Sequence, residues 1–208
     1  MTDYEKILNS GKIYNVWTLT GSDTNYQDDL QKMEKYNSLG YTKEAEKEKH
    51  LILKELLAEI GEGSYIQAPY HAMCAGRHVH LGKKVYINFN CTFVDDANIY
   101  IGDHTMIAPN VTLISASHPI SPKLRREGYG CNKPIYIGEN VWLASNVTVL
   151  PGVHIGNNSV IGAGSVVTKD IPANVIAIGT PAKVVREITP DDDIYYDNGK
   201  LISENIIE

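Results

Sequence analysis

Apolar residues recur every six positions through the middle of the chain and predict a β-solenoid. Before the break in this repeat its leading positions are Leu81, Ile87, Phe93, Ile101, Ile107 and Leu113. After the break they are Ile137, Leu143, Val149, Ile155, Ile161 and Val167. Six residues suit a short strand and a tight corner, so three units make one triangular coil with the leading side chains stacked inside. We therefore expect a mainly β protein built as a parallel β-helix.

The repeat keeps its register across a gap of 24 residues between Leu113 and Ile137. Because 24 is four times six, residues 119–136 replace several units as a protruding, charged loop. Ser117-His118-Pro119 stands at the root of this loop. A histidine on a loop that leaves a rigid repeat is well placed for catalysis.

Four coils can be counted, over residues 81–98, 101–118, 137–154 and 155–172. The step from Phe93 to Ile101 is eight residues, so we expect Asp95 and Asp96 in a two-residue bulge. Bulges re-aim side chains and are frequent beside functional sites.

The remaining chain divides into two flanking segments. Residues 1–62 carry helical patterns, and apolar residues at 52, 53, 56, 57 and 60 form one face of a helix running to Gly61. This segment can cap one end of the β-helix of residues 63–188, which needs its ends covered. Residues 189–208 are expected to form a surface-bound tail or a short closing helix.

Composition excludes several classes of function. The chain has 208 residues and a formal net charge of -6, which argues against a nucleic-acid surface. No apolar run is long enough to span a membrane, and the acidic N-terminus does not resemble a secretory signal. The three cysteines lack a C-x-x-C spacing, which favours reduced thiols in a cytoplasmic protein.

Several motifs occur in a fixed order along the chain. They are Asn88-Phe89-Asn90-Cys91, Val94-Asp95-Asp96, Ile107-Ala108-Pro109-Asn110-Val111, Ser117-His118-Pro119, Asn140-Val141-Trp142 and the run from Gly162 to Pro172. Together they resemble the hexapeptide-repeat acyltransferases, and within them the galactoside and maltose O-acetyltransferase group. The resemblance implies a left-handed β-helix and a homotrimer. It also implies that clefts between neighbouring prisms bind acetyl-CoA and a small acceptor for direct transfer in a ternary complex.

Acetyl transfer from a thioester to a hydroxyl needs a base, oxyanion stabilisation and alignment. His118 suits the base, because an imidazole titrates near neutrality, and it matches the family's catalytic histidine. By resemblance, Asn88 contacts the acceptor and helps to stabilise the transition state, and Asp96 contacts the sugar. From the residues alone, His118 could merely hydrogen-bond its own turn, and Asn88 could simply form a corner.

The resemblance also assigns residues to coenzyme A. Ser145 contacts the donor, through its backbone amide as an oxyanion donor. The other matching positions are Ala163, Thr168, Lys169, Lys183 and Arg186. Cationic groups suit the phosphates, although Lys183 stands where the family often has Arg and gives up a bidentate fork. Trp142 is either a wall for pantetheine or a plain packing aromatic.

The acceptor side departs from the family pattern. Val16 replaces an Asp, Cys74 replaces a Ser or Asp of the acceptor site, and Ala75 replaces a Tyr. The common Gly-x-Glu of the loop becomes Gly128-Tyr129-Gly130, and a helix Arg is missing. A site built to pair hydroxyls discriminates through those pairs, so we expect an acceptor other than galactoside or maltose.

The sequence also bears on two other chemistries, a covalent relay through a cysteine and a zinc centre. No motif supports a covalent relay through Cys74, and Cys91 falls at an inward repeat position. A zinc centre needs converging histidines, whereas His118 has no histidine five positions on. The other histidines considered fall at surface-type positions: His78, His80, His104 and His154. We expect no metal.

Three functions remain open. The first is an acetyl-CoA-dependent O-acetyltransferase for a sugar or similar hydroxyl compound. The second is an acetyltransferase for an antibiotic hydroxyl or an amine, and the third is a non-catalytic binding β-helix. The presence of His118, Asn88 and the donor motif favours an enzyme.

Overall fold

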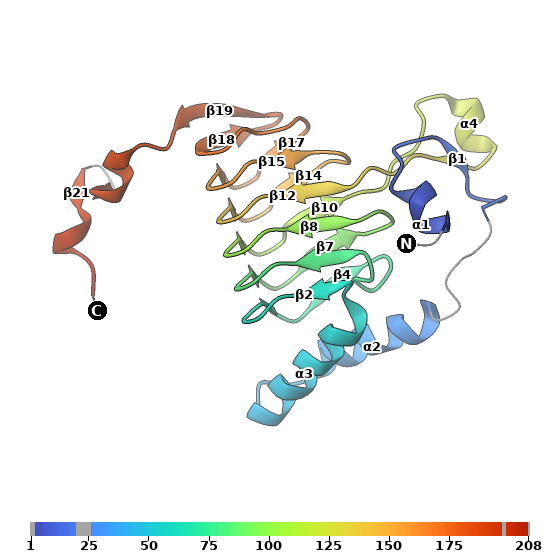
Figure 1. Cartoon of the computed structure of the whole chain (residues 1–208), viewed down its shortest axis with the longest axis horizontal. Helices are drawn as coiled ribbons and strands as arrows, with labels where there is room; N and C mark the ends of the chain where they lie inside the picture. Colours follow the sequence, from blue (N-terminus) through green and yellow to red (C-terminus); the bar gives the residue numbers. More distant parts are fainter. Residues whose placement is uncertain (1–2, 20–25, 197–198, 208) are drawn as a thin grey trace.

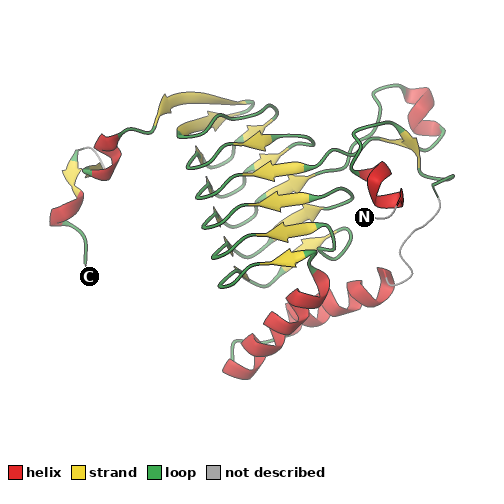
Figure 2. Ribbon diagram, in the orientation of Figure 1, coloured by secondary structure: helices red, strands yellow, loops and turns green. Residues whose placement is uncertain are grey.

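The computed structural model describes residues 3–19, 26–196 and 199–207. Part of the irregular stretch expected between Trp17 and Asn25 lies outside these residues. Figures 1 and 2 show a prism of stacked coils with helices at one end and an arm at the other. The prediction of a mainly β, left-handed parallel β-helix is confirmed.

Three parallel sheets form the walls of the prism. The first wall consists of β2 (Glu59–Ile60), β5 (Val79–Leu81), β8 (Ile99–Ile101), β12 (Ile135–Ile137) and β15 (His154–Ile155). The second wall consists of β3 (Tyr65–Ile66), β6 (Tyr86–Ile87), β9 (Met106–Ile107), β13 (Trp142–Leu143), β16 (Val160–Ile161), β18 (Val175–Gly179) and the antiparallel β19 (Ala182–Glu187). The third wall consists of β4 (Tyr70–Ala72), β7 (Cys91–Val94), β10 (Thr112–Ile114), β14 (Thr148–Val149) and β17 (Val166–Val167).

The apolar core of the prism is the predicted set of repeat positions. All twelve leading residues are buried, each at most 3% exposed, and Cys91 is fully buried as expected. Parallel register places each leading side chain over its counterpart in the next coil, as for Phe93, Leu113 and Val149. Corners between the second and third walls use left-handed backbone at Asn90, Asn110 and Asn146, a conformation that asparagine tolerates.

The solenoid is longer than the four coils counted from the sequence. The predicted helix to Gly61 ends at Leu56, and β2 already pairs with β5 in the first wall. β18 continues the second wall beyond residue 172. At the loop, β12 begins at Ile135, just inside the expected range of 119–136. Apolar side chains at these strands extend the column beyond the part with strict six-residue spacing.

Helices cover the N-terminal end of the prism. α1 (Asp3–Leu8) precedes α2 (Tyr26–Ser38) and α3 (Lys43–Leu56), and the last two lie under the first coil (Figure 1). The buried Tyr36 hydroxyl donates to the carbonyl of Ile66, and its ring meets Tyr70 edge-on at 5.3 Å. Within the described residues, none of the helices is long and apolar enough to cross a membrane.

An aromatic ladder runs along the outside of the first wall. His80, Tyr100, Tyr136 and His154 occupy the same register position on successive strands, with ring centroids 4.5, 5.0 and 4.5 Å apart. His80 and His154 are thus exposed to the outer face, as the repeat predicts. The ladder lies on the wall whose strand β12 directly follows the loop.

The C-terminal residues form an arm rather than one closing helix. It contains η1 (Pro190–Asp193), a hairpin of β20 (Tyr195–Tyr196) and β21 (Lys200–Leu201), and η2 (Ile202–Glu204). Figure 1 shows the arm reaching away from the prism beyond β19.

Candidate active site

His118 lies where the chain leaves the prism after β10. The buried Ser115 fixes this exit, because its hydroxyl donates to the carbonyl of Val94 and accepts the N–H of Ala97. His118 is exposed, and its Nδ1 lies 3.1 Å from the carbonyl oxygen of Tyr129. A carbonyl only accepts, so Nδ1 carries the hydrogen in this bond and Nε2 keeps a free lone pair. That arrangement leaves the imidazole ready to accept a proton.

The loop that holds His118 is itself structured. Ser121 caps the short helix α4 (Pro122–Arg126), and β11 (Tyr129–Gly130) follows it. β11 pairs antiparallel with β1 (Tyr14–Asn15), so the N-terminal segment lies against the loop. A Cβ on Gly130 would lie 3.2 Å from the Tyr14 ring and 3.5 Å from Val16 Cγ1. The glycine therefore lets an aromatic and an aliphatic side chain approach the loop closely beside His118.

The edge between the third and first walls gathers most of the acceptor candidates. Cys74, Asp96 and His118 follow β4, β7 and β10, which are neighbouring strands of the third wall. Burial raises the pKa of Asp96, while nearby His78 and His118 counteract part of that rise. Burial and the neighbouring carboxylates of Asp95 and Asp96 raise the pKa of the Cys74 thiol. Cys74 is therefore a neutral thiol at neutral pH, which argues against the covalent relay.

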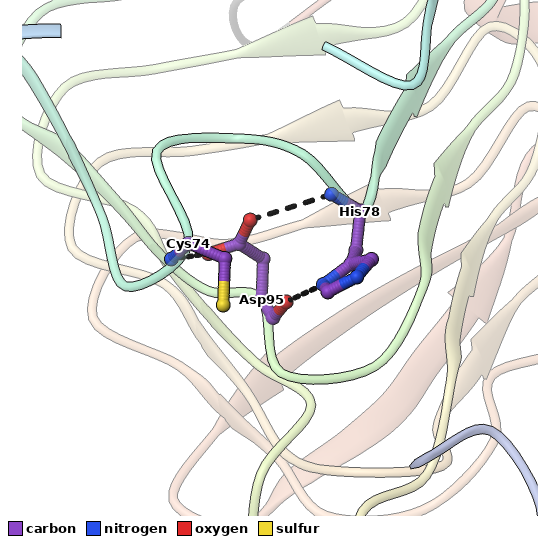
Figure 3. Close-up of side chains that lie close together, drawn as sticks. All are labelled: Cys74, His78 and Asp95. Carbon is purple, nitrogen blue, oxygen red and sulfur yellow. Dashed lines mark hydrogen bonds between the residues drawn. The ribbon is translucent and has the colours of Figure 1, made fainter. Parts of the chain in front are cut away.

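The Asp95 carboxylate holds the turn that carries Cys74 through hydrogen bonds to its backbone. Its carboxylate accepts the backbone N–H of Cys74 at 2.8 Å and that of Gly76 at 3.1 Å, with His78 N at 3.5 Å (Figure 3). His78 Nδ1 lies 2.5 Å from the Asp95 carbonyl and donates to it. The surface position expected for His78 is wrong, because this bond holds the ring in a buried corner with 8% exposure.

The same three residues bring possible metal ligands within 4.8 Å of one another. However, the carboxylate of Asp95 already serves backbone amides, and the Nδ1 of His78 already serves a carbonyl. Cys74 would also have to lose its proton beside two carboxylates. These bonds make the cluster a structural staple of the corner.

Two buried polar atoms near Tyr14 lack partners in the described part of the chain: Asp96 Oδ2 and Asn132 Nδ2. Asn132 is only 2% exposed and faces the Tyr14 hydroxyl. Burial, with Asp96 nearby, raises the pKa of Tyr14 to about 12, so its phenol is a hydrogen-bond donor at neutral pH. Tyr4 of α1 also lies near Cys74 and Asp96, and burial raises its pKa. The site therefore offers an unpaired carboxylate oxygen of Asp96 near His118, with the Tyr14 phenol and the unpaired Asn132 amide next to it.

Sequence reasoning missed Tyr4 and Asn132. Both lie outside the six-residue repeat, in segments where no periodicity indicates which way a side chain points. Antiparallel pairing of β1 with β11 brings the N-terminal segment to the loop, and that pairing joins residues more than a hundred positions apart.

The donor candidates lie elsewhere on the prism. Trp142, 48% exposed on the second wall, belongs to an outward row that continues through Val160 and Ile176 to Arg186. Lys183 pairs with Ile178 on the same wall. Thr168 and Lys169 are exposed after β17, at the edge that carries His118. These five predicted coenzyme A residues thus lie in two places on the prism.

A second edge, between the second and third walls, carries the rest. Asn88 follows β6, Ser145 follows β13 and Ala163 follows β16. Gly164 N–H donates to the Ser145 carbonyl at 2.9 Å, while the Ser145 N–H has no acceptor in the described chain. One chain therefore places Asn88 and Ser145 on a different prism edge from His118.

Comparison with known proteins gives concordant matches. The family model "Bacterial transferase hexapeptide (six repeats)" matches residues 134–169. The chain is 51% identical over 176 residues to the galactoside O-acetyltransferase of Lactococcus lactis subsp. lactis (strain IL1403), covering 85% of this chain and 84% of that protein. It is 49% identical over 153 residues to the galactoside O-acetyltransferase of Escherichia coli (strain K12), covering 74% of each. A solved galactoside acetyltransferase in complex with coenzyme A aligns with TM-score 0.86 and 39% identity, over 97% of this chain and 98% of that one.

Proposed function

Because the chain belongs to the galactoside and maltose O-acetyltransferase group of the hexapeptide-repeat acyltransferases, it is an acyltransferase that uses acetyl-CoA, and we propose that it acetylates a hydroxyl of a sugar or similar small acceptor. The observation that carries this proposal is that Asp96 Oδ2, close to His118, and Asn132 Nδ2, close to Tyr14, are buried without hydrogen-bond partners among the described residues. A buried polar atom without a partner costs free energy, about 1–3 kcal/mol for each group. A polyhydroxy acceptor relieves both costs, because a hydroxyl donates and accepts at once.

His118 acts as the general base in this reaction. Its Nε2 takes the proton of the acceptor hydroxyl while the hydroxyl oxygen bonds to the acetyl carbon. The bond from that carbon to the coenzyme A sulfur breaks, and the proton passes from the imidazolium to the departing thiolate. The bond from Nδ1 to the Tyr129 carbonyl persists throughout and stabilises the imidazolium. Transfer is direct, in a ternary complex, because Cys74 is a neutral thiol.

The complete cleft needs a second copy of the chain. His118 lies at one prism edge, whereas Asn88 and Ser145 lie at another. A homotrimer of parallel prisms would bring the second wall of one protomer to the loop of its neighbour. The free N–H of Ser145 would then serve the oxyanion, and the row from Trp142 to Arg186 would follow the length of coenzyme A.

The acceptor site combines polar groups with an apolar wall. One side of the loop is lined by Val16, the ring of Tyr14 and Gly130. In the family pattern, carboxylates stand at the positions of Val16 and Gly130 and would contact a sugar there. This wall favours an acceptor that carries an apolar group next to its hydroxyls, and it keeps a non-sugar hydroxyl compound as the second candidate.

The three unpaired thiols fit a cytoplasmic enzyme.

An acceptor screen tests the proposal. Acetyl-CoA consumption is followed by thiol release with galactosides, maltose, alkyl and aryl glycosides, antibiotic hydroxyls and amines. The proposal predicts turnover with at least one hydroxyl acceptor and stronger turnover with glycosides that carry an apolar aglycone. Turnover with amines alone would overturn O-acetylation. Absence of turnover with every compound, in a protein that also fails to bind coenzyme A, would overturn the enzyme itself.

A further inference from the structure

The guanidinium of Arg186 is held at its end by one carboxylate. Arg186 Nη1 lies 2.7 Å from Asp192 Oδ2, and Nη2 lies 2.7 Å from Asp192 Oδ1. Nη1 also donates to the Glu187 carbonyl at 2.9 Å. Such a planar, bidentate pair fixes the orientation of an otherwise flexible side chain.

Asp192 is itself fixed by the backbone. Its Oδ2 accepts the N–H of Thr189 at 2.9 Å, and the two residues form a reciprocal capping box at the start of η1. Arg186, with help from this N–H, lowers the pKa of Asp192 to about 2. The carboxylate is therefore charged and in place at any working pH.

Arg186 has two further N–H groups, which together form a two-pronged hydrogen-bond donor, the free fork. Of the five guanidinium hydrogens, the two on Nη1 and one on Nη2 have partners. The Nε hydrogen and the second Nη2 hydrogen have none among the described residues. These two lie along the same edge of the guanidinium plane, in the geometry that matches two oxygens of a phosphate.

The position of Arg186 indicates which ligand these two N–H groups would bind. Arg186 pairs with Ile176 and ends the outward row that contains Trp142. Resting on the proposed use of this wall by coenzyme A, we propose that Asp192 is a positioning residue, which aims the Nε–Nη2 edge of Arg186 at a phosphate of the bound coenzyme. Asp192 does not touch the coenzyme; it acts through Arg186.

Binding measurements with three ligands test this role. Coenzyme A, 3′-dephospho-coenzyme A and pantetheine are titrated into the wild type, Asp192→Asn and Asp193→Asn by calorimetry. The Asp192→Asn side chain would keep an oxygen for the Thr189 N–H but lose the charged pair. We expect Asp192→Asn to weaken coenzyme A about fivefold, the scale of an exposed ion pair, and to leave pantetheine unchanged. Asp193→Asn makes the same charge change one residue away, on an exposed side chain, and should bind like the wild type.

The dephosphorylated ligand identifies which phosphate is held. If the 3′-phosphate meets the fork, Asp192→Asn and the wild type will bind 3′-dephospho-coenzyme A equally. If the diphosphate meets it, the fivefold loss will persist with that ligand. In the Arg186→Ala background, adding Asp192→Asn should cause no further loss, because the two residues act as one unit.

Equal or tighter coenzyme A binding by Asp192→Asn would overturn the inference. So would an equal loss for pantetheine, which would indicate a merely structural role, or the same loss in Asp193→Asn. Wild-type coenzyme A affinity in Arg186→Ala would instead contradict the proposed binding of coenzyme A along the second wall. The two failures are therefore distinguishable.

Discussion

The Nδ1 of His118 donates to the carbonyl oxygen of Tyr129 across 3.1 Å, and this bond joins the imidazole to the loop. The loop is held in turn by the N-terminal segment, through the pairing of β11 with β1. The orientation of the imidazole thus depends on residues 14–16, far from it in the sequence. Backbone pairing therefore helps to decide where the Nε2 lone pair of His118 points.

Gly128→Ala tests whether this pairing matters for catalysis. Gly128 has a φ of 79°, and a Cβ there would collide with the indole of Trp17. Because the positive φ also strains an alanine there, we expect the loop to shift and to move the Tyr129 carbonyl, and with it His118. We expect kcat to fall about a hundredfold, the cost of a misplaced catalytic group, while coenzyme A binding is retained. Gly199→Ala is the control, because Gly199 has a φ of 86° but no neighbour within 4 Å. Equal kcat in both variants would contradict the dependence.

Asn132→Ala should weaken the acceptor and spare the donor. The buried Nδ2 of Asn132 has no hydrogen-bond partner in the described chain, so it is free to bind the acceptor. Loss of one hydrogen bond to the acceptor should lower kcat/KM for the acceptor about tenfold, with KM for acetyl-CoA unchanged. Steady-state kinetics with each substrate varied in turn measures both. Lys123→Ala, an exposed loop change, should alter neither. An unchanged acceptor kcat/KM in Asn132→Ala would remove this residue from the site.

Tyr14 makes the stability of the fold depend on alkaline pH. Burial raises its pKa from 10.0 to about 12 in the folded chain. Between these values the unfolded chain releases a proton that the folded chain retains. The stability that the protonated phenol contributes is therefore complete below pH 10 and is lost as pH rises through about 12. Tyr14→Phe cannot ionise, so its free energy of unfolding should gain on that of the wild type across this interval.

Denaturant unfolding at several alkaline pH values measures the difference between the two proteins. Tyr41→Phe is the control, because Tyr41 is 74% exposed. A difference between wild type and Tyr14→Phe that stays constant from neutral pH to about pH 12 would contradict the buried phenol.

The aromatic ladder should contribute to stability without contributing to catalysis. Tyr136 stacks between Tyr100 at 5.0 Å and His154 at 4.5 Å on the outer face of the first wall. Tyr136→Ala removes both contacts and should lower the free energy of unfolding by about 1–2 kcal/mol. Tyr136→Phe keeps the ring and should cost little. Urea unfolding of both variants decides the point: an equal loss would mean that the hydroxyl, rather than the stack, carries the effect.

The prism was predictable because its physics is periodic. A side chain such as Leu113 or Ile161 must point inward if its six-residue neighbours do, so one period fixes every core position. The same phase places Ser145 and Ala163, 18 residues apart, at one edge. The count of coils was too low because Glu59–Ile60 joins the first wall without the strict repeat.

The acceptor site was only partly predictable because it is not periodic. His78 is buried by a hydrogen bond to the Asp95 carbonyl, and a repeat of apolar residues gives no sign of that bond. Asn132 and Tyr14 meet through pairing between two segments that both lie outside the repeat. The resemblance predicted roles for His118 and Asp96. Only the folded chain shows the unpaired Asn132 amide next to Tyr14, which in turn lies near Asp96.

The most direct test of His118 as the base compares wild type with His118→Asn. An asparagine amide can replace the Nδ1 hydrogen bond to Tyr129 but offers no basic nitrogen at the position of Nε2. Acetyl transfer to the best hydroxyl acceptor and coenzyme A affinity are measured on both proteins. The account predicts a loss in kcat of about 10²–10⁴-fold in His118→Asn with coenzyme A affinity unchanged. Wild-type turnover by His118→Asn would contradict it.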